Sequence, residues 1–379
     1  MKTELPVQPG SFDTVFKGGR IPSLNGWRAV AILLVLISHA HLTRGFPLEL
    51  FSLKYPLVYF LQTLGLLGVR LFFVLSGFLI THLLLKEAEK NGRVSLKSFY
   101  IRRALRIFPV YFIYLGVLGV LCLFGLYHDG SSSWFGVLTF TRNIFGKAPS
   151  LTTHFWSLAV EEQFYLVWPA LIVGLILWRR FKTAFCLLLI PVLMCPLERM
   201  AGMNMGTNGS LFGRIFGEWS ILAYADSLAV GCLGAFLIRK IDYTLKPFSA
   251  SLMLVLAMVV IIVGEWCRWT GCLHNKALDS FIPGVQALAV MLAMWISIFH
   301  TTGLSHRILN WASVEWLGVL SYSLYVWHAL FLSVNSGSKL GQYWFYDWRI
   351  WWLPAVATAI FSYYCIERPI LKLKQKCVE

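Results

Sequence analysis

The chain of 379 residues is 58% hydrophobic and only 13% charged, whereas an ordinary soluble protein is near a quarter charged. This composition excludes a typical soluble domain and indicates an integral membrane protein. The net charge of +15 does not indicate nucleic-acid binding, because membrane proteins gather Lys and Arg in their cytoplasmic loops.

Apolar stretches of about 20 residues, the length that crosses a bilayer as a helix, recur along the chain. The residues 57–65 either form an interfacial segment or lengthen the second of these helices. We predict an all-α integral membrane protein with about ten transmembrane helices, at residues 27–45, 66–85, 108–127, 154–177, 183–199, 218–238, 248–265, 281–300, 316–334 and 349–366.

The chain shows no linker long enough to separate two domains. We therefore predict one membrane domain over residues 1–379, with its membrane core at about 21–370 and a short tail at each end. The polar start, up to Gly19, passes directly into the first predicted helix without a small-residue cleavage pattern, so we expect no cleavable signal peptide.

The basic residues predict how the helices are oriented. Most Lys and Arg fall in the segments that share a side with the N-terminus, so the positive-inside rule places both termini in the cytoplasm. The densest block holds Arg102, Arg103 and Arg106, at the cytoplasmic entry to the third helix. These arginines either grip phosphates of a cytoplasmic cofactor or only determine the topology.

A basic residue and a histidine share one face of the first predicted helix. Arg28 and His39 are eleven positions apart, which is three helical turns plus about 20° and about 16 Å along the axis. Arg28 would then lie at a membrane surface and His39 inside, where a titratable group is a functional candidate. His41 faces about 200° away from His39. The alternative for His39 is a packing histidine hydrogen-bonded to a neighbouring helix.

A second candidate face opens the fourth predicted helix. Ser157, Glu161 and Tyr165 follow one another at intervals of four residues and share a face, whereas Glu162 is rotated by about 100°. A carboxylate beside an imidazole would hold its tautomer and raise its basicity. The alternative is a pair of acids favoured by the dipole at a helix start.

Polar groups from five different helices fall at nearly one predicted depth, about 6–12 Å from the outer surface at 1.5 Å per residue. If they faced one another, they would satisfy the demand that buried charges be paired. Arg70, one of these groups, either pairs with one of the acids or contacts a substrate. Ser76 and Gly77, further along the same helix, permit close helix approach. The set is His39, Arg70, Glu161, Asp226 and His328.

The eight cysteines show no metal-ligand spacing, and we expect no metal. Cys267 and Cys272 share one short loop, so they either form a disulfide in an oxidising compartment or remain free. The other cysteines in apolar segments are expected to be small packing residues.

Several motifs together resemble acyltransferase family 3, the membrane proteins that include the O-antigen and nodulation-factor O-acetyltransferases. The resemblance runs from about residue 21 to 370 and is weak at about 180–310 beyond Asp226. No fused esterase-like domain of the kind found in some members is visible. The motifs are Arg28-x10-His39, residues 68–78, Arg102-Arg103-x-x-Arg106-Ile-x-Pro109, residues 155–169, residues 317–328 and Ile366-Glu-Arg-Pro369.

The resemblance implies transfer of an acyl group, usually acetyl, from cytoplasmic acyl-CoA to a hydroxyl of an extracytoplasmic or lipid-linked carbohydrate. Such an enzyme (EC 2.3.1.-) would lie in the bacterial inner membrane and modify lipopolysaccharide or exopolysaccharide. The family's Arg-x10-His pair matches Arg28 and His39, and its Ser-x-x-x-Glu matches Ser157 and Glu161. The arginines would hold the CoA nucleotide.

The hypothesis for the mechanism makes His39 the general base, or the carrier in a covalent acyl-histidine relay, with Glu161 orienting the imidazole. Glu162, Arg70, Asp226 and His328 remain substrate contacts or structural polar groups. Two other function classes stay open. A proton-coupled transporter also uses intramembrane ionisable residues, although no inverted repeat is visible, and a scaffold protein would not need them. The acceptor could also be a small secreted glycoside.

Overall fold

The computed structural model describes residues 21–46, 54–146, 150–177, 181–204, 220–239, 247–272, 275–332 and 339–376. Throughout these ranges the regular elements are helical, and the β-type pairing found there is one isolated bridge between Arg44 and Asp347. The predicted all-α class is therefore confirmed for the described residues.

The helices differ widely in length, and the last two are joined through a π-helical turn, η5 (Tyr363–Glu367), into one rod. In chain order they are α2 (Leu24–His39), α3 (Lys54–Asn91), α4 (Leu96–Leu123), α5 (Ser131–Leu138), α6 (Phe155–Leu177), α7 (Phe181–Asn204), α9 (Ile221–Leu237), α10 (Pro247–Thr270), α11 (Lys276–Phe299), α12 (Leu304–Leu309), α13 (Ala312–Trp327), α14 (Trp352–Ser362) and α15 (Arg368–Lys376).

Six described helices are long and apolar enough to cross a membrane: α3, α4, α6, α7, α10 and α11. Helix α9 is apolar but shorter. Each of the ten predicted segments overlaps a helix. The multi-pass architecture is thus confirmed, whereas the count of ten spans and the cytoplasmic placement of the termini stay predictions.

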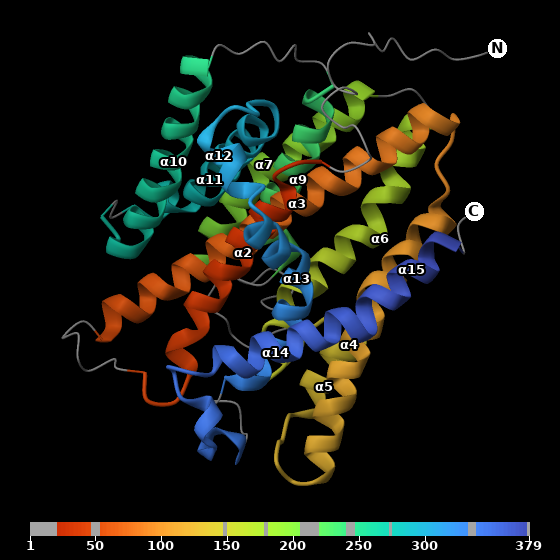
Figure 1. Cartoon of the computed structure of the whole chain (residues 1–379). Coiled ribbons are helices and arrows are strands. Elements are labelled where there is room, and N and C mark those ends of the chain that lie inside the picture. Colours follow the sequence, from red (N-terminus) through yellow and green to blue (C-terminus); the bar gives the residue numbers. More distant parts are fainter. Residues whose placement is uncertain are drawn as a thin grey trace.

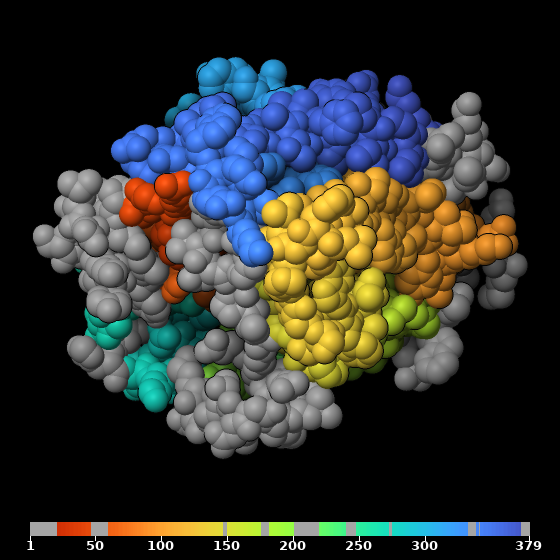
Figure 2. Space-filling model, turned by 90° about the horizontal axis from the view of Figure 1, so that it is seen from below, coloured from red at the N-terminus to blue at the C-terminus, as the bar shows by residue number. Residues whose placement is uncertain are grey.

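Helix α3 is the central element of the bundle (Figure 1). Its 38 residues extend over about 57 Å, so the apolar residues 57–65 lengthen the second predicted helix. Helices α2, α6, α9, α10 and α11 all pack against α3. On the other side of the molecule, α4 lies beside the C-terminal α15 (Figure 2).

The first predicted helix is shorter than expected, which is a correction. Helix α2 ends at His39 rather than at residue 45, and a 3-10 turn, η1 (Ala40–Leu42), follows. The physical reason is that side chains satisfy the carbonyls at this helix end. His41 Nδ1 lies 2.5 Å from the carbonyl oxygen of Ser38, and the Thr43 hydroxyl donates to the carbonyl of Ala40 at 2.5 Å. His39 therefore lies at a helix end and is half-buried.

Glycines let the central helices touch backbone to backbone. A Cβ added at Gly77 of α3 would lie 2.1 Å from the carbonyl oxygen of Leu228, and one at Gly231 of α9 would lie 2.1 Å from that of Val74. Such small-residue contacts are typical of membrane helices. The close approach expected at Gly77 is confirmed.

A third glycine contact joins the two helices that carry the histidines discussed below. A Cβ added at Gly318 of α13 would lie 1.8 Å from the carbonyl oxygen of Asn25 in α2. The contact holds these backbones together three residues before Arg28 on α2 and three before Ser321 on α13.

Elsewhere, Cys267 and Cys272 are both free thiols in this structure.

Because a backbone carbonyl cannot move aside cheaply, Gly77→Ala should lower the free energy of unfolding by about 1–3 kcal/mol. Thermal denaturation of the detergent-solubilised protein measures the change. Gly116→Ala is the matched control, since a Cβ at this α4 position meets nothing within 4 Å. Equal melting temperatures for the two variants would contradict the packing argument.

Candidate active site

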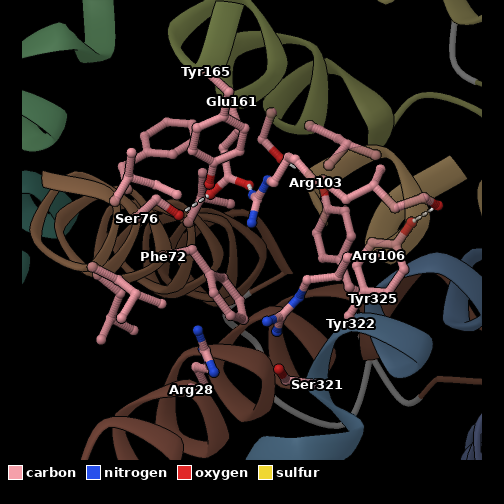
Figure 3. A pocket seen from close by; sticks show the side chains of 18 residues that line it. Arg28, Phe72, Ser76, Arg103, Arg106, Glu161, Tyr165, Ser321, Tyr322 and Tyr325 are labelled. Carbon is pink, nitrogen blue, oxygen red and sulfur yellow. Dashed lines mark hydrogen bonds and ion pairs between the residues drawn. The ribbon is translucent and has the colours of Figure 1, made fainter. Parts of the chain in front are cut away.

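Helices α2, α3, α4, α6 and α13 enclose a cavity with about 780 Å³ of empty space, its open side included. Its apolar wall comes mainly from α3, whereas its polar groups, apart from Ser76 of α3, come from the other helices (Figure 3). The polar lining residues are Arg28, Ser76, Arg103, Arg106, Ser157, Glu161, Tyr165, Ser321, Tyr322 and Tyr325.

Guanidinium groups of Arg28, Arg103 and Arg106 point into the same space (Figure 3). Arg28 donates a hydrogen bond to Asn25 at 3.2 Å. Arg106 has no hydrogen-bond partner among the described residues. Because buried charges require a partner, the few fixed partners of Arg28 and Arg106 make this part of the cavity suited to an anion.

Arg102, which was predicted to act with these arginines, lies outside the cavity lining. Its guanidinium donates to Glu87 at 3.0 Å. The reason is helical geometry, since Arg102 is rotated by about 100° from Arg103 and by about 40° from Arg106, toward the end of α3 that carries Glu87. The structure therefore places Arg103 and Arg106, but not Arg102, in the cavity lining, and cofactor binding by Arg102 stays a prediction.

The carboxylate of Glu161 sits on the cavity wall beside Arg103. It accepts a hydrogen bond from the Ser76 hydroxyl at 2.7 Å and lies 4.0 Å from the Arg103 guanidinium. Glu162 lies 3.9 Å from Arg103 on its other side, and the guanidinium stacks 3.7 Å above the centre of the Tyr165 ring. The predicted face of Ser157, Glu161 and Tyr165 does line one cavity.

The predicted meeting of Glu161 with His39 is not found. Glu161 makes its contacts with Ser76 and Arg103, and His39 is not among the residues that line the cavity. A buried carboxylate is stabilised most by the nearest cation, and α6 packs so that this cation is Arg103.

His39 instead meets His328, the residue after the end of α13. The His39 Nδ1 and His328 Nε2 atoms are 3.0 Å apart, and the two rings are nearly parallel with centroids 5.0 Å apart. His328 is fully buried. The predicted proximity of these two histidines, both placed at one depth, is thus confirmed.

Tyr325 connects the cavity to the histidine pair. Its hydroxyl lies 2.5 Å from the Ser157 hydroxyl and donates to the carbonyl of His154. Its ring centroid is 5.9 Å from that of His328, and the His154 ring centroid is 5.2 Å from that of His328. The site therefore continues from the arginines past Ser157 and Tyr325 to the imidazoles.

The remaining polar groups predicted at the same depth belong to separate clusters, which corrects the single-cluster expectation. Arg70 lies 4.0 Å from Glu265 and donates to Gln286 at 3.4 Å. Asp226 accepts from Arg199 at 2.7 Å. Helices α3 and α9 pack together, yet Arg70 and Asp226 pair with other helices. Equal depth does not decide toward which neighbouring helix a side chain points.

Comparisons with known proteins identify the family of the chain. A family model described as an acyltransferase domain matches residues 21–368. The chain belongs to this acyltransferase family. No solved structure matches the chain.

Two relatives carry O-acetyltransferase names. The peptidoglycan O-acetyltransferase OatA of Listeria monocytogenes is 27% identical over 336 residues, covering 83% of this chain and 50% of the relative. The O-acetyltransferase OatA of Staphylococcus aureus is 29% identical over 384 residues, covering 93% of this chain and 57% of the relative. The chain thus spans about half the length of these relatives.

Sequence reasoning about this acyltransferase-family chain missed the roles of Tyr322, Tyr325 and His154 in the site. A usable signal was the three-residue interval between Tyr325 and His328, which places both on one side of α13. His154 precedes α6, where helical periodicity says nothing about direction.

The Tyr325 hydroxyl should be a structural support of the site. Tyr325→Phe leaves the Ser157 hydroxyl and the His154 carbonyl without this partner, so we expect the free energy of unfolding to fall by about 1–3 kcal/mol, measured by thermal denaturation. Tyr364→Phe is the control, because that exposed hydroxyl only accepts from Trp316 at 3.3 Å. An unchanged melting temperature for Tyr325→Phe would refute the role.

Proposed function

We propose that this chain is a membrane O-acyltransferase that moves an acyl group, first of all acetyl, from acyl-CoA to a hydroxyl of an extracytoplasmic or lipid-linked carbohydrate. The observation that carries the proposal is that two groups of polar side chains are neighbours. Three guanidinium groups and Tyr325 line one cavity, and the Tyr325 ring lies 5.9 Å from the ring of His328, which pairs with His39 outside the lining.

The arginine end fits the nucleotide of the donor. Acyl-CoA carries several phosphates, and arginines bind phosphate with charge-assisted, often bidentate hydrogen bonds. Arg28 and Arg106 have few partners of their own, and Arg103 is held near Glu161 and Glu162 without a short hydrogen bond to either. We assign these three arginines to the donor phosphates, and we assign Glu161 to holding Arg103.

The imidazole end fits the chemistry. Arg28 and His39 are separated by about 16 Å along α2, so the pantetheine arm of a donor bound at Arg28 can extend along the cavity past Ser157. The thioester would then approach His39 from the Tyr325 side.

The transfer step is general base catalysis at His39. The imidazole takes the proton of the acceptor hydroxyl while the hydroxyl oxygen attacks the thioester carbonyl. The tetrahedral intermediate collapses, the C–S bond breaks, and the CoA thiolate leaves and takes the proton from the imidazolium. The products are an O-acyl ester and CoA. In the covalent variant, His39 attacks the thioester first and passes the acyl group to the acceptor.

The acceptor class is proposed from the family and from the name of one relative. That name indicates peptidoglycan as the acceptor of the Listeria protein, and lipopolysaccharide or exopolysaccharide are the other envelope glycans. All are carbohydrates that carry hydroxyls outside the cytoplasm, so a bacterial inner-membrane location follows from the proposal.

Membranes that contain the protein, supplied with radiolabelled acetyl-CoA and the host's envelope glycan, test the reaction. Removing a general base typically costs about 10²–10⁴ in rate, so His39→Ala should lose glycan labelling by that factor. His128→Ala is the matched control, because His128 is exposed and lies outside the cavity lining.

Full labelling by His39→Ala would show that a residue other than His39 is the catalytic base. No labelling by the wild type, with acetyl and longer acyl donors and with both glycans and small glycosides as acceptors, would reject the proposal. It would favour the proton-coupled transporter, which also uses ionisable groups inside the membrane.

Binding of CoA to the detergent-solubilised protein tests the donor site. Arg106→Gln removes a charge from the cavity lining and should weaken binding about 10- to 100-fold, since a hydrogen bond to a charged group is worth about 1.5–3 kcal/mol. Arg102→Gln is the control, because Arg102 pairs with Glu87 outside the lining. Equal dissociation constants for the two variants would place the nucleotide elsewhere.

A further inference from the structure

We propose that His328 is a positioning residue that fixes the tautomer of His39, so that the basic atom of His39 is Nε2. The order of hydrogen bonds stands independently, whereas its catalytic meaning rests on the proposed function.

The His328 ring is tied to the backbone of its own helix. Its Nδ1 atom lies 2.8 Å from the carbonyl oxygen of Tyr325 and 3.2 Å from that of Leu324. Carbonyl oxygens only accept hydrogen bonds, so the His328 Nδ1 must carry a proton. These carbonyls lie in the last turn of α13, and the Leu324 carbonyl also accepts the backbone N–H of His328.

The proton on Nδ1 decides what the other nitrogen of His328 can do. In a neutral imidazole one nitrogen donates and the other accepts, so Nε2 of neutral His328 is an acceptor. This acceptor lies 3.0 Å from Nδ1 of His39, which must therefore donate. Nδ1 of neutral His39 then carries the proton, and Nε2 holds the free electron pair.

The packing around His328 makes this assignment firm. The His328 side chain is fully buried, and the two rings stack with only 16° between their planes. Helix α13 packs along α2, and the Gly318 contact with Asn25 lies near the other ends of these two helices. The packing of the two helices keeps the donor and the acceptor next to each other.

The pair does the work that a carboxylate does in a hydrolase triad, namely to orient an imidazole and hold its tautomer. The His39–His328 pair differs from such a triad because its hydrogen-bond acceptor, the His328 imidazole, is neutral. When His39 takes a proton on Nε2, its Nδ1–H still donates to His328, but no negative charge stabilises the imidazolium. The proton is therefore passed on readily to a leaving thiolate.

The other titratable groups that face the pair are few in the described part of the chain. His41 follows on the same turn, His154 lies beside His328 with a ring distance of 5.2 Å, and Tyr325 lies one turn before it. No acidic side chain among the described residues hydrogen-bonds either ring. The group that orients His39 is therefore the imidazole of His328, which is the side chain that contacts its Nδ1 atom.

Nitrogen NMR of the protein labelled with ¹⁵N-histidine tests the hydrogen-bond order directly. The His39 signals are assigned by their loss in His39→Ala. We expect a protonated Nδ1 and an unprotonated Nε2 in wild-type His39 at neutral pH. In His328→Phe, which keeps the ring volume but removes the acceptor, the His39 proton should shift toward Nε2. A wild-type His39 with its proton on Nε2, or an unchanged tautomer in His328→Phe, overturns the proposal.

The acetyl-transfer assay tests the catalytic meaning. His328→Phe should lower kcat by about 100-fold or more with little change in KM for acetyl-CoA, because a wrong tautomer costs about 10⁴ in a hydrolase triad. His328→Gln, whose amide oxygen can accept from His39, should recover most of the rate. Equal kcat in His328→Phe and wild type would reject the positioning role and leave the proposed function standing. An inactive wild type would reject the function, and the NMR result would still decide the tautomer.

Discussion

Charge pairing among apolar helices is the constraint on which the polar structure of this protein depends. A charge that leaves water must find a counter-charge or hydrogen bonds, and the described charges of the bundle do so within their own neighbourhoods. Arg70 turns to Glu265, Arg199 to Asp226, and Arg103 to Glu161 and Glu162. The three clusters lie at different helix contacts, so each fixes the rotation of its own helices.

The cavity departs from this balance. In the cavity lining, three guanidinium groups accompany one carboxylate, that of Glu161, which lies near Arg103. Glu367, outside the lining, is the further acid whose charge acts on Arg28 and Arg106. A surplus of guanidinium groups is costly in an apolar bundle without an anion, and it is suited to one that carries phosphates. This excess of guanidinium groups in the lining, rather than the cavity's size, is what supports the proposed nucleotide-bearing donor.

Two helix ends define the other half of the site. Helix α2 stops at His39 and α13 stops just before His328, and each is followed by a 3-10 turn. Unpaired carbonyls at such ends recruit side chains, and here they recruit His41 and His328 itself. Helix termination therefore does more than end a span, because it orients the imidazoles that face each other.

Hydrophobic runs and helical periodicity by themselves determined the all-helical class, the approximate helix positions, and the shared face of Ser157, Glu161 and Tyr165, because these are properties of a single helix. They did not determine which helices would be neighbours. Glu161 on α6 pairs with Arg103 on α4 instead of His39, and α2 ends early, where side chains bond the carbonyls at its end. Which helices are neighbours follows from contacts between helices, such as the backbone contacts at Gly77, Gly231 and Gly318. The sequence gives the depth of a residue along its helix, whereas only the packed bundle decides which helices are neighbours and which way each helix face points.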